Sequence, residues 1–165
     1  MLRLLFPAVI LLTGLLMFQC KPTRSVLTIS ELPNYNSQFQ DHILFLHFRI
    51  TGNPGGGKEK VELVSATVGN GRMKDIRRPV TFPVYINVVP RYAGDSLRRE
   101  MQVEHPLRRS IEVSDAEGQI RRQEVRQKEG TFVIRMPVEA GLNGLELFSV
   151  SPERGGVQIY NLRFK

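Results

Sequence analysis

The hydrophobic pattern of the chain changes at Val26, after which short apolar or alternating runs are separated by Gly, Asn, Asp and Pro. No long stretch of this part repeats its apolar positions every 3.6 residues or so, the spacing of an amphipathic helix. The clearest strand spans residues 42–50. One of its faces is apolar along its length, with Leu44, Leu46, Phe48 and Ile50, and the other face is apolar only in its first half, with Ile43 and Phe45. This pattern predicts a central strand covered on both faces.

Further strands are expected at 61–68, 84–89, 99–104, 110–113, 119–126, 131–136, 145–150 and 157–164. Turn-forming pairs such as Asn70-Gly71 lie between them, and residues 31–41 and 72–83 are expected to be loops. The strands and short connections predict an all-β fold, an antiparallel two-sheet sandwich of the immunoglobulin-like or jelly-roll-like kind over residues 26–165. Because the chain has no Trp, the Cys, Trp and Cys signature of true immunoglobulin domains is missing.

The first part of the chain has the pattern of an export signal. Arg3 gives a short positive start, and an apolar run extends from Leu4 to Phe18. This run is shorter than the about 20 residues that a helix needs to cross a bilayer. Residues 1–19 are therefore expected to be a signal peptide that is removed.

The only cysteine, Cys20, directly follows that run in the sequence Leu16-Met17-Phe18-Gln19-Cys20. This segment resembles the lipobox of bacterial lipoproteins, although Gln19 stands where the family has a small residue. The resemblance implies cleavage before Cys20, lipid on its thiol, and residues 20–25 as a lipidated tether. Each buried methylene of an acyl chain contributes about 0.8 kcal/mol, so two chains hold a protein on a membrane. The expected location is the bacterial cell envelope, with membrane and face left open.

Two other interpretations of the start of the chain stay open at this point. One is a signal anchor that is not cleaved, and the other is a cleaved, soluble secreted protein. In each case the single cysteine cannot form a disulfide within the chain, so the domain has to be stabilised by its core.

The formal net charge is +7, and arginine doublets are the unusual feature of the middle of the chain. They would form a surface for an anionic partner such as a glycan, a lipid headgroup or an acidic protein: Arg77, Arg78, Arg98, Arg99, Arg108, Arg109, Arg121 and Arg122. The favoured alternative is that each doublet places one arginine outward, where it pairs across strands with an acid such as Glu104 or Glu124. Nucleic acid is not expected as a partner of an exported protein.

Candidate chemistry is weak. Residues 52–58 fit the spacing of a phosphate-binding loop, but Glu59 follows Lys58 where Ser or Thr is needed, and a strand rather than a helix is expected next. The chain has no G-x-S-x-G nucleophile motif. His42 and His47 should point to opposite faces of one strand, and His105 is expected at a turn. We therefore expect no catalytic residue, no metal site and no cofactor.

Residues 103–137 also resemble small uncharacterised exported β-sandwich domains, through the segments VEHPLRRSIEVSDAEGQIRRQEV and EGTFVIRMP. The function expected is a non-catalytic, lipid-anchored binding or assembly module with an envelope protein as partner. Residues 157–164 are expected to be an exposed edge strand that could accept a partner strand. The alternative function is a carbohydrate-binding or glycan-processing accessory domain, for which the available aromatic residues are Tyr35, Phe39, Tyr85, Tyr92 and Tyr160.

Overall fold

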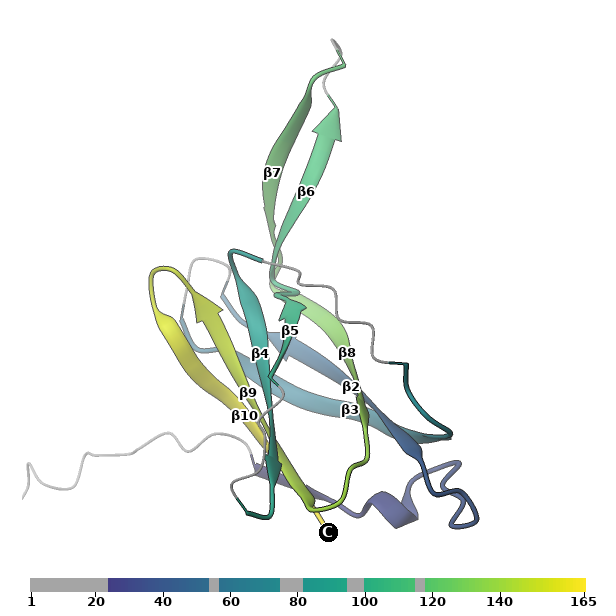
Figure 1. Cartoon of the computed structure of the whole chain (residues 1–165). Coiled ribbons are helices and arrows are strands. Elements are labelled where there is room, and N and C mark those ends of the chain that lie inside the picture. Colours follow the sequence, from purple (N-terminus) through teal and green to yellow (C-terminus); the bar gives the residue numbers. More distant parts are fainter. Residues whose placement is uncertain (1–23, 54–56, 75–81, 95–99, 115–117) are drawn as a thin grey trace, which may run out of the picture.

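The computed structural model describes residues 24–53, 57–74, 82–94, 100–114 and 118–165 (Figure 1). These residues form a five-stranded sheet in the order β1-β10-β9-β4-β5, a three-stranded sheet in the order β3-β2-β8, and the two-stranded hairpin β6-β7. One short 3₁₀ helix, η1, covers Ile29–Glu31. The strands are β1 Arg24–Leu27, β2 His42–Thr51, β3 Lys60–Asn70, β4 Tyr85–Tyr92, β5 Met101–Glu104, β6 Arg108–Ser114, β7 Ile120–Arg126, β8 Glu129–Pro137, β9 Leu142–Ser151 and β10 Gly155–Phe164.

Strand β2 is the centre of the three-stranded sheet, as its two-sided apolar pattern predicted. It pairs antiparallel with β3 on one side and with β8 on the other. Its inward residues Leu44, Leu46, Phe48 and Ile50 are fully buried, and its outward residues Ile43 and Phe45 are half-buried. The alternation of the sequence therefore sets which face of this strand enters the core.

The core lies between the two large sheets and centres on Phe48. Its ring stacks on that of Phe132 from β8, with centroids 5.2 Å apart, and meets the edge of Tyr160 from β10 at 5.4 Å. Full burial of an aromatic or branched side chain contributes about 1.5–3 kcal/mol, so this layer dominates the stability of the domain. The expected all-β two-sheet sandwich is confirmed.

One strand pair is parallel. Strand β1 runs beside the end of β10, from Arg24 opposite Asn161 to Leu27 opposite Phe164. The Tyr160 hydroxyl donates a 2.8 Å hydrogen bond to Ser25 Oγ and fastens β1 to the sheet. Strand β1 begins inside the segment 20–25 expected to be a tether, and the prediction that the terminal strand is a sheet edge is wrong where β1 covers it.

The β6-β7 hairpin projects from one end of the sandwich (Figure 1). We call its described residues, 108–114 and 118–126, the arm. Its two strands pair with each other, from Arg108 opposite Arg126 at its base to Ser114 opposite Ile120 near its tip. Within the part of the chain that the structure describes, it is therefore a two-stranded ribbon without a third strand or an opposing sheet.

Candidate functional site at the projecting arm

The arm is rooted in the core through the three residues that precede β6. His105, Pro106 and Leu107 are all buried, and Leu107 belongs to the hydrophobic core cluster. The backbone pairing continues below the arm, where Gln127 N–H donates to Leu107 O at 2.9 Å. The chain therefore leaves the core after Leu107 and returns to it after Gln127.

A glycine lets the two sides of the root approach closely. A Cβ added at Gly130, in β8, would lie 2.6 Å from Pro106 Cβ and 3.2 Å from Pro106 O. Such distances are below normal van der Waals contact, so the position requires glycine while Pro106 stays in place. Close backbone packing fixes where the arm emerges.

Beneath the root lies a buried polar cluster of Glu59, His105 and Ser149. The His105 side chain is fully buried and that of Glu59 is 4% exposed, while Glu59 Oε2 lies 3.5 Å from His105 Nε2. The same ring nitrogen lies 3.2 Å from Ser149 Oγ. The cluster joins the β2–β3 connection, the β5–β6 connection and β9, three segments that are distant in sequence.

The heavy-atom geometry assigns the proton of the His105 ring. Leu107 N–H donates to His105 Nδ1 at 3.3 Å, so Nδ1 is an acceptor and the proton of the neutral ring lies on Nε2. Nε2–H then points toward Ser149 Oγ and the Glu59 carboxylate. In a serine–histidine–acid relay, the acid and the serine contact opposite ring nitrogens, which this arrangement does not provide.

Glu59 is held in its ionised form. Burial raises the pKa of its carboxyl, but the nearby His105 N–H, the Ser149 hydroxyl and the positive charge of Arg154 outweigh burial, so the net pKa lies below the usual value. Among the described residues, no donor reaches its Oε2 atom in normal hydrogen-bond geometry. The carboxylate therefore depends on its neighbours at the root for compensation of its charge.

Two further contacts tie the same end of the sandwich together. Arg154 Nη1 donates to Gly57 O at 2.9 Å, which links the β9–β10 turn to the β2–β3 connection. Arg108 Nη1 lies 4.0 Å from Glu153 Oε2, and the Arg108 side chain is only 13% exposed. The first arginine of the arm is thus part of its root rather than a free surface cation.

The arm above its root has two different faces. Strand alternation and the pairing register put six residues on one side, which we call the Ile111 face: Arg109, Ile111, Val113, Arg121, Gln123 and Val125. Ile111 is 42% exposed and Val113 is 40% exposed. The opposite side, the Glu124 face, has Arg108, Glu112, Ile120, Glu124 and Arg126 among its described side chains.

The structure describes only half of the eight arginines of the predicted anionic-partner surface. Arg77, Arg78, Arg98 and Arg99 lie outside the described residues, as does the predicted lipid site Cys20. The remaining four arginines, Arg108, Arg109, Arg121 and Arg122, are all in the arm. Arg109 Nε lies 3.5 Å from Glu104 Oε2 in β5, a strand that does not pair with β6, so this ion pair is not one across paired strands.

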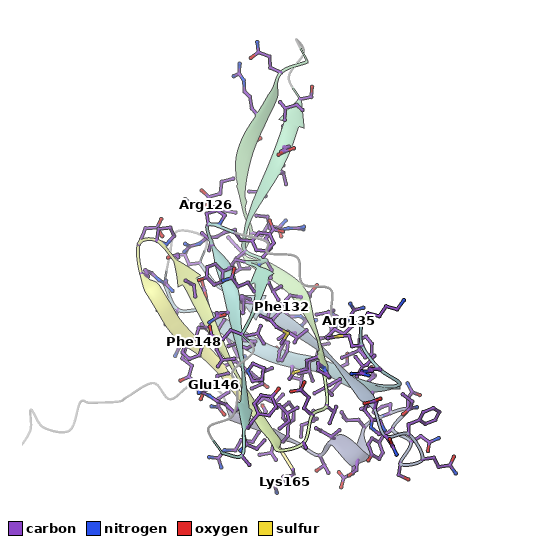
Figure 2. All side chains as sticks on the ribbon, viewed as in Figure 1. Arg126, Phe132, Arg135, Glu146, Phe148 and Lys165 are labelled. Atoms are coloured by element: carbon purple, nitrogen blue, oxygen red, sulfur yellow. The ribbon has the colours of Figure 1, made fainter. Side chains whose placement is uncertain are left out.

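Figure 2 shows Arg126 where the arm meets the sandwich, and Phe132 inside the sandwich, in β8. Arg126 Nε lies 3.1 Å from Glu124 Oε1, so acid and base are matched on the Glu124 face. The exposed Ile120, at 71%, is on that same face near the tip.

The other candidate residues of the sequence do not converge. His42 is buried against Tyr35, with ring centroids 4.7 Å apart, whereas His47 is half-buried on the other face of β2, as predicted. In the part of the chain that the structure describes, no three His, Cys, Asp or Glu side chains gather as a metal ion would require. No helix of the described part has the length and apolar character to cross a membrane.

The glycine-rich segment 52–58 connects β2 to β3, so a strand follows it, as expected from its sequence. Of the aromatic residues considered for glycan binding, Tyr160 is in the core and Phe39 is the one whose exposure, at 49%, is large. Tyr92 donates from its hydroxyl to Glu139 Oε2 at 2.9 Å. One largely exposed ring among these five residues does not make the exposed aromatic platform that the glycan alternative requires.

No family model matches this chain, and neither a curated protein nor a solved structure does.

The buried cluster at the root was not predicted from the sequence. Glu59 was considered only as a charge that spoils a phosphate loop, and His105 only as a turn residue. Ser149 carries no neighbouring motif. The one available signal was the alternation of β9, which puts Ser149 and Ser151 on the same face as Leu145 and Leu147.

Proposed function

We propose that the protein is a lipid-anchored, non-catalytic binding or assembly module of the bacterial cell envelope, and that it engages a protein partner through the arm. The observation that carries this proposal is the arm itself, which extends exposed Ile111, Val113 and Ile120 away from a closed sandwich. An isolated two-stranded hairpin is only marginally stable in water. A partner that packs on the arm would cover these exposed apolar side chains and stabilise the hairpin.

The position of β1 supports an orientation in which the arm points away from the membrane. Cys20 precedes Arg24 by four residues, a chain length that spans at most about 14 Å. Arg24 pairs with Asn161 toward the end of β10, whereas the root of the arm lies near Ser149 and Ser151, which pair with the beginning of β10. A lipid on Cys20 would hold the β1 end near the membrane and leave the arm directed toward other envelope components.

The scattered aromatics argue against the glycan alternative. Carbohydrate-binding surfaces on β-sandwiches need aromatic rings that are exposed side by side, and Tyr160 and Tyr35 are engaged in the core and on His42. Partner binding by the arm requires no such platform.

The anchor is tested by Cys20→Ser in the full chain. We expect loss of labelling by a radioactive fatty acid and release of the protein from the membrane fraction, or accumulation of its precursor. Unchanged processing together with unchanged membrane extraction would remove the lipid anchor from the proposal.

Partner binding is tested by excision of the arm. Because Gln127 N–H pairs with Leu107 O, residues 108–126 can be replaced by Asn-Gly, a pair that closes two-residue hairpins. We expect the excised variant to keep its circular dichroism spectrum and its membrane association, and to lose the proteins that cross-link reproducibly to the intact chain. Retention of the same cross-linked proteins by the folded variant would refute binding through the arm.

A further inference from the structure

The Ile111 face of the arm combines apolar and positive residues. The face begins just above Leu107, which is buried in the core directly before β6. Ile111 and Val113 are exposed there, beside Val125, which is half-buried. These residues form an apolar strip without a covering element among the described residues.

The charges of the arm are distributed unequally between its faces. The Ile111 face has Arg109 and Arg121 at its two ends and contains no acidic position. The Glu124 face has Glu112 and Glu124 beside its arginines, and Arg126 is bonded to Glu124. Arg109 does contact an acid, but this acid is Glu104 of β5, outside the arm. An apolar strip with arginines at both ends complements an apolar patch bordered by carboxylates.

A second copy of the chain fits this face poorly. In a two-fold symmetric contact the same patch would meet itself, so the arginines of both copies would be brought together around a shared apolar centre. Like charges across an interface disfavour association. Charge complementarity therefore favours a different, acidic occupant.

An anionic membrane is also a poor occupant when the proposed anchor is in place. The root of the arm and the pairing site of β1 lie toward opposite ends of β10. The strand of the arm, Arg108–Ser114, adds seven residues beyond the root, or about 23 Å at the usual rise of a strand. The tip thus extends away from the end to which lipid would be attached.

We infer that the Ile111 face docks an acidic protein surface, with Ile111 and Val113 in its apolar centre and Arg109 and Arg121 paired with carboxylates at its border. This inference rests on the proposed function and adds the face of the arm and the chemistry of the partner. Arginine is well suited to the border because its guanidinium can bind a carboxylate through two hydrogen bonds.

The test is site-specific photo-cross-linking in cells that carry the full, anchored chain. A benzoylphenylalanine replaces Ile111 or Val113 on the docking face, Ile120 on the Glu124 face, or Val133, which is 55% exposed on β8. We expect one protein to be linked from Ile111 and Val113 and not from the two control positions. The linked peptide of that protein should be rich in Asp and Glu, and its yield should fall with added salt.

Charge reversal gives the second measurement. Arg109→Glu together with Arg121→Glu should lower the Val113 cross-link by about tenfold or more, since repulsion replaces attraction. Replacement of both by Lys should retain most of the yield. Arg126→Glu, on the other face, is the matched control and should change the yield less than about twofold. Circular dichroism of each purified variant verifies that it is folded.

Several results would overturn this inference. They are a linked peptide without acidic residues, a second copy or lipid as the linked species, or equal yields after charge reversal. Cross-links to a protein from Ile120 alone would overturn it but leave binding through the arm in place, whereas cross-links from Val133 alone would overturn both. No protein cross-link from any of the four positions would overturn both.

Discussion

Leu107→Ala measures how firmly the arm is rooted in the core. Leu107 is 1% exposed and packs in the main hydrophobic cluster, and its Cδ1 lies 3.2 Å from where a Cβ of Gly52 would be. Truncation of a buried leucine to alanine lowers the free energy of unfolding by about 2–5 kcal/mol. For a domain of this size each kcal/mol lowers the Tm by about 3 °C, so a decrease of roughly 6–15 °C is expected.

The matched control is Val113→Ala, in β6, six residues after Leu107 and on the Ile111 face. Because Val113 is 40% exposed and lies far out on the arm, its truncation should change the free energy of unfolding by less than about 0.5 kcal/mol. Thermal unfolding followed by circular dichroism measures both variants. Equal destabilisation by the two truncations would show that the arm is packed along its length, which contradicts a buried root and an exposed ribbon.

Three further predictions concern the root and the sheet. Gly130→Ala should lower the free energy of unfolding by about 1–3 kcal/mol in urea titrations, because the new Cβ would collide with Pro106. The lowered pKa of Glu59 stabilises the fold above the ordinary glutamate pKa, and this contribution is lost progressively as the pH falls below 4.5; Glu59→Gln should flatten that part of the curve of urea midpoint against pH. Tyr160→Phe should cost about 1 kcal/mol through its lost hydrogen bond, and a double-mutant cycle with Ser25→Ala should be non-additive.

Each of these three has a control within the chain. Gly156→Ala places a Cβ at an ordinary 3.9 Å from Val150 Cγ2 and should be nearly neutral. Glu129→Gln alters an exposed pair with Arg49 and should leave the pH curve unchanged. A neutral Gly130→Ala, a pH curve that Glu59→Gln does not alter, or strict additivity of the Tyr160 and Ser25 changes would each contradict the contact concerned.

The sandwich could be predicted because its strands alternate cleanly. In β2 and β8 the buried residues occupy every second position, so the sequence specifies both the strand and the face it buries. Strand β1 was not expected because only four residues pair, and their partner is β10, at the other end of the chain. Parallel pairing of distant segments leaves little trace in local sequence.

The site was less predictable than the fold. Both strands of the arm and the turn between them were expected, but alternation of apolar and charged residues does not show whether either face is covered by the sandwich. The Glu59, His105 and Ser149 cluster joins residues more than 40 positions apart. The alternation of β9 indicates that Ser149 faces inward, but a single sequence does not show which distant residues it contacts. The four described residues of the arginine doublets all lie in the arm, and Arg108 is part of its root.

Amide hydrogen exchange of the arm tests the central claim most directly. The full chain is measured in envelope membranes, where the partner is present, and after purification in detergent without other proteins. The amides of β6 and β7 should exchange at least about tenfold more slowly in the membranes, because a marginal hairpin is stabilised by its partner, while those of β2 stay the same. Equal exchange of the arm in the two samples would contradict the account that the arm is the docking element.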